Sequence, residues 1–178
     1  PCNICDPAPP FASIVKLGRN KTLSLVAKGV RNSVGFDWHP LSNNLWFTDN
    51  GRDHLGDELP SDELNHAHKA GLHFGYPFIH GENTEDPQFS TSLPINHTPP
   101  SYLLGAHVAP LGMVFIKEQS RENRDTQTLF IAEHGSWNRS KKVGYRVVKL
   151  TIKNDQVLTH QPFISGWLKG EEHWGRPN

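Results

Sequence analysis

An acidic segment from residue 49 to residue 65 holds the densest group of side chains that could do chemistry. It contains six of the chain's 18 acidic residues and one basic residue, Arg52, in a chain whose formal net charge is zero. Calcium takes about six to eight oxygen ligands from carboxylates and carbonyls. The segment therefore suggests a calcium site, but it lacks the EF-hand spacing, and a solvated acidic loop explains it equally well. The six acids are Asp49, Asp53, Asp57, Glu58, Asp62 and Glu63.

Three short motifs combine arginine with glycine and polar residues. The first joins 30–35 with 49–52, the second spans 133–139, and the third spans 174–177. Arginine suits the bidentate recognition of carboxylates, and a neighbouring glycine lets the backbone approach a ligand closely. If the motifs occupy equivalent ends of repeated units, their arginines could converge on one anionic ligand. Each arginine taken singly could equally be a solvated surface cation.

Other metal-binding and catalytic patterns are weakly supported. His66 and His68 would share one face of a strand, but no carboxylate pair at a zinc-site spacing accompanies them. Ser136 is not part of the Gly-x-Ser-x-Gly elbow of serine hydrolases. Cys2 and Cys5 lack both the following histidine of a haem attachment site and the second cysteine pair of a zinc ribbon. They form either a small disulfide-closed loop in an oxidising compartment or two free thiols.

The elements that must position these motifs are short β-strands. With 15 Gly, 14 Pro, 9 Phe and 5 Trp in 178 residues, the composition favours one all-β domain of short strands and tight turns. From about 50 to 105 the apolar pattern fades into polar, Gly- and Pro-rich sequence, which we interpret as a long functional loop. The predicted strands are 11–17, 22–27, 33–38, 45–48, 111–116, 128–132, 145–152 and 157–164.

An internal repeat indicates the fold class. Residues 45–51 (Leu-Trp-Phe-Thr-Asp-Asn-Gly) correspond to residues 129–135 (Leu-Phe-Ile-Ala-Glu-His-Gly), and each segment follows a strand that carries Gly35 or Gly112. Recurring four-stranded antiparallel units are typical of β-propeller blades, and a β-sandwich with accidental similarity is the alternative. The predicted partial β-propeller comprises the end of one blade at 1–28, an interrupted blade at about 33–105, a complete blade at about 109–165 and the start of the next at 174–178.

Charge argues against a nucleic acid partner, and hydropathy argues against a membrane-spanning segment. Lysine plus arginine equals aspartate plus glutamate, at 18 each, and no segment clusters basic with aromatic residues, so a nucleic acid partner is not expected. No apolar run approaches the roughly 20 residues that cross a bilayer. We therefore expect no membrane segment in this chain.

In order along the chain, the motifs resemble the glucose/sorbosone dehydrogenase family, which comprises soluble quinoprotein sugar dehydrogenases and L-sorbosone dehydrogenase-like enzymes. The resemblance implies a six-bladed β-propeller, pyrroloquinoline quinone (PQQ) and calcium as cofactors, and oxidation of an aldose or related sugar. It further implies a periplasmic or secreted protein that uses a sugar substrate and an electron acceptor. The segments that carry it are 1–5, 29–40, 45–57, 62–65, 74–77, 106–113 and 132–140.

The same resemblance implies candidate site residues. The backbone carbonyls of Gly51 and Arg52 would bind calcium, at a place where the best-known members have Gly-Pro. The cation expected after strand 128–132 is lysine in those members, so His134 or Arg139 must replace it here. The residues matched to the cofactor are Arg31, Asn32, Asn50, His134, Arg139 and Arg176.

The family's catalytic histidine has no counterpart in this chain. It lies in a blade upstream of the Cys-x-x-Cys segment, so the base is expected before Pro1, and we expect the chain to be a fragment with about half of the ring. A non-catalytic ligand- or protein-binding propeller of the same family is the alternative function. A calcium-dependent lactonase-type hydrolase is a more distant one.

Overall fold

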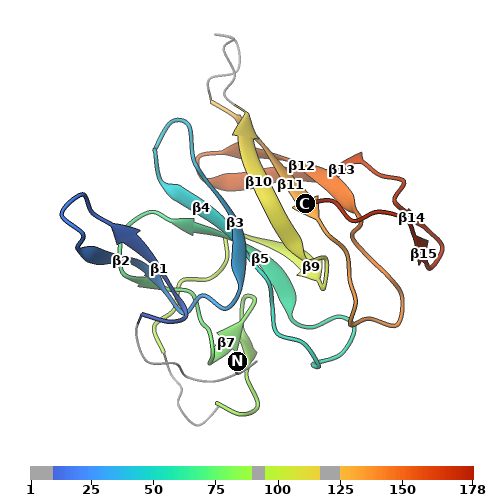
Figure 1. Cartoon of the computed structure of the whole chain (residues 1–178), viewed down its shortest axis with the longest axis horizontal. Helices are drawn as coiled ribbons and strands as arrows, with labels where there is room; N and C mark the ends of the chain where they lie inside the picture. Colours follow the sequence, from blue (N-terminus) through green and yellow to red (C-terminus); the bar gives the residue numbers. More distant parts are fainter. Residues whose placement is uncertain (1–9, 90–94, 117–124) are drawn as a thin grey trace.

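The computed structural model describes residues 10–89, 95–116 and 125–178, which form strands and turns without a helix. No helix that could cross a membrane occurs within these ranges. Cys2 and Cys5 lie outside them. The all-β prediction is confirmed for the described part of the chain (Figure 1). The strands are β1 (Ser13–Leu17), β2 (Leu23–Lys28), β3 (Ser33–Trp38), β4 (Leu45–Asp49), β5 (Ser61–Ala67), β6 (Leu72–His73), β7 (Ile79–His80), β8 (Thr84–Glu85), β9 (Tyr102–Ala106), β10 (Pro110–Ile116), β11 (Gln127–Glu133), β12 (Arg146–Lys153), β13 (Gln156–Ile164), β14 (Leu168–Lys169) and β15 (Glu172–His173).

Two four-stranded antiparallel sheets dominate the structure. One has the strand order β3-β4-β5-β9 and the other β10-β11-β12-β13. Neighbours in each sheet follow one another along the chain, which is the up-and-down order of propeller blades. All eight strands expected from the sequence are present, and the repeated segments 45–51 and 129–135 begin with corresponding strands, β4 and β11.

The segment from 50 to 105 is more ordered than the sequence suggests. Strand β5 lies inside it and pairs with β4, and β9 closes the same sheet after an excursion through β6, β7 and β8. The interpretation as one long loop is therefore wrong for β5 and β9. Strand β5 escaped prediction because its middle residues, Asp62, Glu63, Asn65 and His66, are polar although they are buried.

The β3-β4-β5-β9 sheet has buried apolar side chains on both faces, because alternate residues of a strand point to opposite sides. On β4, Trp46 belongs to a core shared with the β10–β13 sheet, whereas Phe47 belongs to a second core against Phe74 and the β1–β2 side. The larger core consists of Trp46, Leu64, Leu104, Val108, Phe115, Leu129, Ile131, Val148, Leu150 and Ile152.

The leading strands of the two sheets, β3 and β10, pack directly against each other (Figure 1). Thr48 Oγ1 donates to the carbonyl of Leu111 at 3.2 Å, and Phe115 N donates to Asp37 Oδ2 at 2.7 Å. A Cβ on Gly35 would lie 2.0 Å from the oxygen of Leu111. The glycine noted in the repeat thus permits close approach of the two strands.

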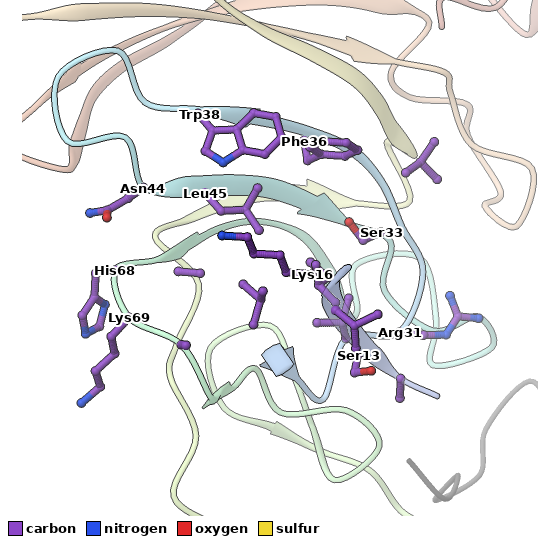
Figure 2. Close-up of a pocket in the computed structure, with 18 of the residues that line it drawn as sticks. Ser13, Lys16, Arg31, Ser33, Phe36, Trp38, Asn44, Leu45, His68 and Lys69 are labelled. Atoms are coloured by element: carbon purple, nitrogen blue, oxygen red, sulfur yellow. The ribbon is translucent and has the colours of Figure 1, made fainter. Parts of the chain in front are cut away.

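A third sheet has the strand order β1-β2-β6 and borders a groove. Strand β1 forms its edge. Between this sheet and β3 lies a groove of about 1030 Å³, in which Phe36 and Trp38 line one side and Lys16 of β1 projects from the other (Figure 2). Phe36 and Trp38 are 56% and 50% exposed, which is unusual for neighbouring aromatic side chains.

We expect Gly35→Ala to lower the free energy of unfolding by about 1–3 kcal/mol, because the added methyl group overpacks the β3–β10 contact. Urea denaturation followed by tryptophan fluorescence measures this change. Val34→Ala is the control, because Val34 precedes it on the same strand and is 48% exposed. Equal stability losses in the two variants would contradict the close-approach explanation.

Candidate functional site

The candidate site residues gather where β4 and β11 end. In an antiparallel sheet these ends lie beside the starts of the preceding strands, and Asp49 indeed pairs with Ser33. Asn50 Nδ2 donates to the carbonyl of Pro110 at 3.3 Å, which joins the end of β4 to the start of β10. Within the second sheet, His134 N donates to the carbonyl of Ala109 at 2.9 Å. The two repeated motifs therefore meet at one end of the molecule.

Asp49 fixes the turn that carries Arg31 and Asn32. Its carboxylate accepts hydrogen bonds from Arg31 N at 2.8 Å and from Asn32 N at 2.6 Å. Asn50 reinforces the turn, because its Nδ2 also donates to the carbonyl of Asn32 at 3.0 Å. Both predicted cofactor residues of this turn are thus held by partly buried hydrogen bonds, Arg31 to Asp49 and Asn32 to Asp49 and Asn50.

The guanidinium of Arg31 lies on the carbonyls that follow β4. Nη1 donates to the carbonyl of Asn50 at 3.1 Å and to that of Gly51 at 2.7 Å, and Nη2 lies 3.5 Å from Asp53 Oδ2. Two successive carbonyl oxygens therefore point at one cationic nitrogen. Carbonyl oxygens are also calcium ligands, so the backbone at Gly51 fits a cation, and Arg31 Nη1 stands in its place.

The described ranges contain no group of three or more His, Cys, Asp or Glu side chains arranged to hold a metal ion. The assignment of the Arg52 carbonyl as a second ligand stays a prediction. The side chain of Arg52 is buried and forms an ion pair with Asp86.

At the end of β11, His134 and Arg176 contact each other. Arg176 Nε donates to the carbonyl of His134 at 3.1 Å and Nη2 donates to that of Gly135, while His134 Nδ1 lies 2.9 Å from the carbonyl of Pro177. The Arg176 guanidinium also lies 5.4 Å from the centre of the Tyr145 ring, within reach of a cation–π interaction.

Arg139 lies apart from this pair. Its Nη2 donates to Glu58 Oε1 at 2.6 Å, its Nη1 donates to the carbonyl of Asp57, and Ser140 N donates to Asp57 Oδ1 at 3.0 Å. Arg139 thus ties the 136–140 loop to the acidic segment. His134 and Arg139 are the two candidates for the position that the family's lysine occupies. His134 lies beside Arg176, whereas Arg139 is bound by Asp57 and Glu58.

Three carboxyl groups of the acidic segment are buried beneath the site, and burial is the main cause of their raised pKa values. The pKa of Asp49 rises to about 7, against the opposing effect of hydrogen bonds from Arg31 N and Asn32 N. That of Asp62 rises to about 6. That of Glu63 rises to about 8, with the charge of Asp49 as the second cause. These acids shape the backbone, while Asp53 and Glu58 pair with arginines.

Comparison with known proteins identifies the family of this chain. The TrAA12-like family model matches residues 61–165, which is more than half of the chain. This chain belongs to the TrAA12-like family. An uncharacterized protein of Borreliella burgdorferi is 44% identical to it over 177 residues, covering 95% of this chain and 47% of that protein.

Two solved sugar-enzyme structures share the fold of this TrAA12-like chain. The carbohydrate-active enzyme family AA12 protein of Trichoderma reesei, in an iodide structure, matches with a TM-score of 0.62 and 24% identity over 80% of this chain and 42% of that one; a calcium structure of it matches similarly. The holo form of the pyranose dehydrogenase PQQ domain from Coprinopsis cinerea matches with a TM-score of 0.60 and 19% identity over 80% and 45%.

The TrAA12-like chain spans less than half the length of these relatives, 47% of the Borreliella protein and 42% to 45% of the two enzymes. The matched residues, 61–165, include β5, β9 and the whole β10–β13 sheet with the end of β11, whereas β3 and β4 lie before them. The sequence resemblance to quinoprotein sugar dehydrogenases is confirmed at the coarse level of a sugar dehydrogenase-like fold.

The buried acids predict a stability that falls as the pH rises. The unfolded chain releases the proton of Glu63 near its ordinary pKa of 4.5, whereas the folded chain retains it to about 8. Stability from this group is therefore full below pH 4.5 and is lost between about 4.5 and 8. Glu63→Gln should flatten the pH dependence of the melting temperature over this interval, because glutamine stays neutral.

Glutamine at 63 can keep the local hydrogen bonds. Gly81 N donates to Glu63 Oε1 at 2.8 Å, and Asn65 Nδ2 donates to Oε2 at 2.8 Å, so only a rotation of the Asn65 amide is required. Glu82→Gln is the control, because Glu82 carries the same charge on an exposed position. A wild-type slope retained in Glu63→Gln would contradict the assignment of the proton to this residue.

Proposed function

We propose that this chain forms part of a PQQ-dependent sugar dehydrogenase that oxidises an aldose or related sugar. The observation that carries the proposal is a chain of contacts between the candidate residues of the two sheets. Asn50 binds the carbonyl of Asn32, next to Arg31, and also that of Pro110 at the start of β10. The neighbouring Ala109 carbonyl accepts from His134, whose own carbonyl accepts from Arg176. Cationic and amide groups from two successive sheets then face one end of the molecule. Family membership and the named PQQ-domain neighbour support this reading.

The roles of the residues follow from their chemistry. Arg31 and Arg176 would bind carboxylates of the quinone, and Asn32 and Asn50 would orient it through hydrogen bonds. We propose His134, rather than Arg139, in the place of the family's lysine, because Arg139 is engaged by Asp57 and Glu58. When bound, PQQ supplies the electron acceptor for the sugar, and calcium polarises it as a Lewis acid.

The carbonyl oxygen of Gly51 would bind calcium, and the carbonyl oxygen of Arg52 is the expected second ligand. Arg31 Nη1 would then leave the Gly51 carbonyl and turn toward the cofactor. The proton acceptor for the sugar is not assigned within this chain. We propose that it is a histidine of the longer polypeptide, as in the family the chain resembles.

The proposed architecture is a six-bladed propeller that continues beyond this chain. The exposed Phe36 and Trp38 and the position of β1 at the edge of its sheet in the described part of the chain support it, because further strands beside β1 would extend this sheet into a blade and fill the groove of Figure 2. We also propose a periplasmic or secreted location and an electron acceptor as the second partner.

A non-catalytic ligand-binding propeller is the second candidate. It is favoured by the contacts that already engage both arginines: Arg31 with the Gly51 carbonyl and Arg176 with the carbonyls of His134 and Gly135. In that case the chain would bind an anionic ligand without oxidising a sugar. A single measurement distinguishes the two candidate functions.

That measurement is dye-linked oxidation of aldoses by the complete polypeptide that contains this chain, reconstituted with PQQ and calcium chloride. We expect reduction of the dye that depends on the sugar, on PQQ and on calcium. PQQ binding without sugar-dependent dye reduction would support the non-catalytic alternative. Absence of both would overturn the proposal.

We expect Arg31→Ala to weaken PQQ binding by about 1–3 kcal/mol, because it removes a charged hydrogen bond to a cofactor carboxylate. This corresponds to a rise in Kd of roughly five- to 150-fold. Titration of the apoprotein with PQQ, followed by absorbance, measures the change. Arg19→Ala is the control, because Arg19 is an exposed arginine in the β1–β2 turn. An unchanged titration for Arg31→Ala would remove Arg31 from the cofactor site.

A further inference from the structure

The chain between β5 and β9 includes a hairpin, β7–β8. The segment after this hairpin contacts the side chain of Arg52, which follows β4. Asp86 follows β8 and is fully buried, with 0% of its surface exposed. Its Oδ2 accepts from Arg52 Nη1 at 2.5 Å and lies 2.8 Å from His80 Nε2, and its Oδ1 accepts from Gln88 N at 2.8 Å. A buried carboxylate with this many donors forms a complete polar network.

The network joins an ion pair to a histidine. Asp86 Oδ2 is shared by Arg52 Nη1 and His80 Nε2, and the side chains of Arg52 and His80 are buried as well, at 9% and 3% exposure. The Asp86 carboxylate thus balances the charge of Arg52, and His80 lies within hydrogen-bond distance of the same oxygen.

The same network fixes the backbone at residues 52 and 53. While Nη1 of Arg52 is bound by Asp86, its Nε donates to the carbonyl of Asp53 at 3.2 Å. On the preceding side, Gly51 N donates to Asp62 Oδ1 at 2.7 Å. The peptide group that carries the Arg52 carbonyl is therefore flanked by two anchored neighbours.

We propose that the β7–β8 hairpin, through Asp86 and His80, anchors Arg52 and thereby holds the backbone carbonyls that follow β4 in place for calcium. This inference rests on the proposed function and adds positioning residues that no motif in the sequence identified. It also explains how arginine serves where related enzymes have proline: the side chain is directed into the hairpin, and the backbone is restrained by that anchor instead of by a ring. Partners one shell outside a metal's ligands typically change its affinity by about 10- to 100-fold.

The test is calorimetric titration of the complete polypeptide with calcium chloride. Asp86→Asn keeps the shape of the side chain but removes the charge that balances Arg52, so we expect the calcium Kd to rise about tenfold or more. Glu85→Gln is the matched control, because it removes the same charge from the neighbouring, exposed position of the same hairpin. We expect its Kd to stay within about twofold of the wild type.

A double variant, Arg52→Leu with Asp86→Leu, separates positioning from stability. It removes both buried charges, so no unpaired ion remains and folding should be retained. We expect a wild-type-like melting temperature in EDTA together with weak calcium binding. If Asp86→Asn does not fold, this variant and His80→Phe, which removes only the hydrogen bond to Asp86, give the answer.

Three outcomes of the calcium titration would overturn different parts of the argument. Wild-type protein that does not bind calcium would overturn the calcium part of the proposed function and, with it, this inference. Wild-type protein that binds calcium while the folded Asp86 and His80 variants bind it equally well would overturn the positioning role alone. Equal weakening by Asp86→Asn and Glu85→Gln would attribute the effect to long-range charge and would also reject positioning.

Discussion

The carboxylate of Asp62 joins the two large sheets at the end where the candidate site lies. One oxygen accepts from Gly51 N and the other accepts from Ala109 N, at 2.7 and 2.8 Å. Asp62 is itself a residue of β5 and is 3% exposed. A buried carboxyl group is costly unless it is hydrogen-bonded, so these two backbone donors and Asp62 depend on each other. The position of the Gly51 carbonyl relative to the second sheet follows from this bridge.

The close packing of β3 against β10 supplies the second constraint. Gly35 lets the two strands approach, and Thr48 and Asp37 hydrogen-bond across to the backbone of β10. This contact places the start of β10 beside the end of β4, and His134 then follows through its hydrogen bond to Ala109. The candidate site is thus a product of the packing between two repeated units, and neither unit contains it alone.

The acidic segment that is prominent in the sequence divides into two kinds of residue in the structure. Asp49, Asp62 and Glu63 are buried, which raises their pKa values, while hydrogen bonds, chiefly from backbone N–H groups, oppose the rise. Asp53 and Glu58 pair with Arg31 and Arg139. The carbonyl oxygens of Asn50 and Gly51 accept from the guanidinium of Arg31, and the predicted calcium ligation by the backbone of Gly51 and Arg52 stays a prediction.

The amino-acid sequence by itself determined the all-β class, the eight strands with alternating apolar residues and the repeat of β4 in β11, because period-two patterns and turn residues are local signals. It also marked Asn50 and His134 as equivalent positions after those strands. Only the tertiary structure decided that β5 is a strand, since its buried polar side chains are satisfied by partners distant in sequence, such as Gly81 N and Ala109 N. The partners of Arg52 and Arg139 were likewise decided by folding, because a charged side chain of the same type can bind a ligand, face solvent or balance a buried acid, and the choice depends on which chain segment packs beside it.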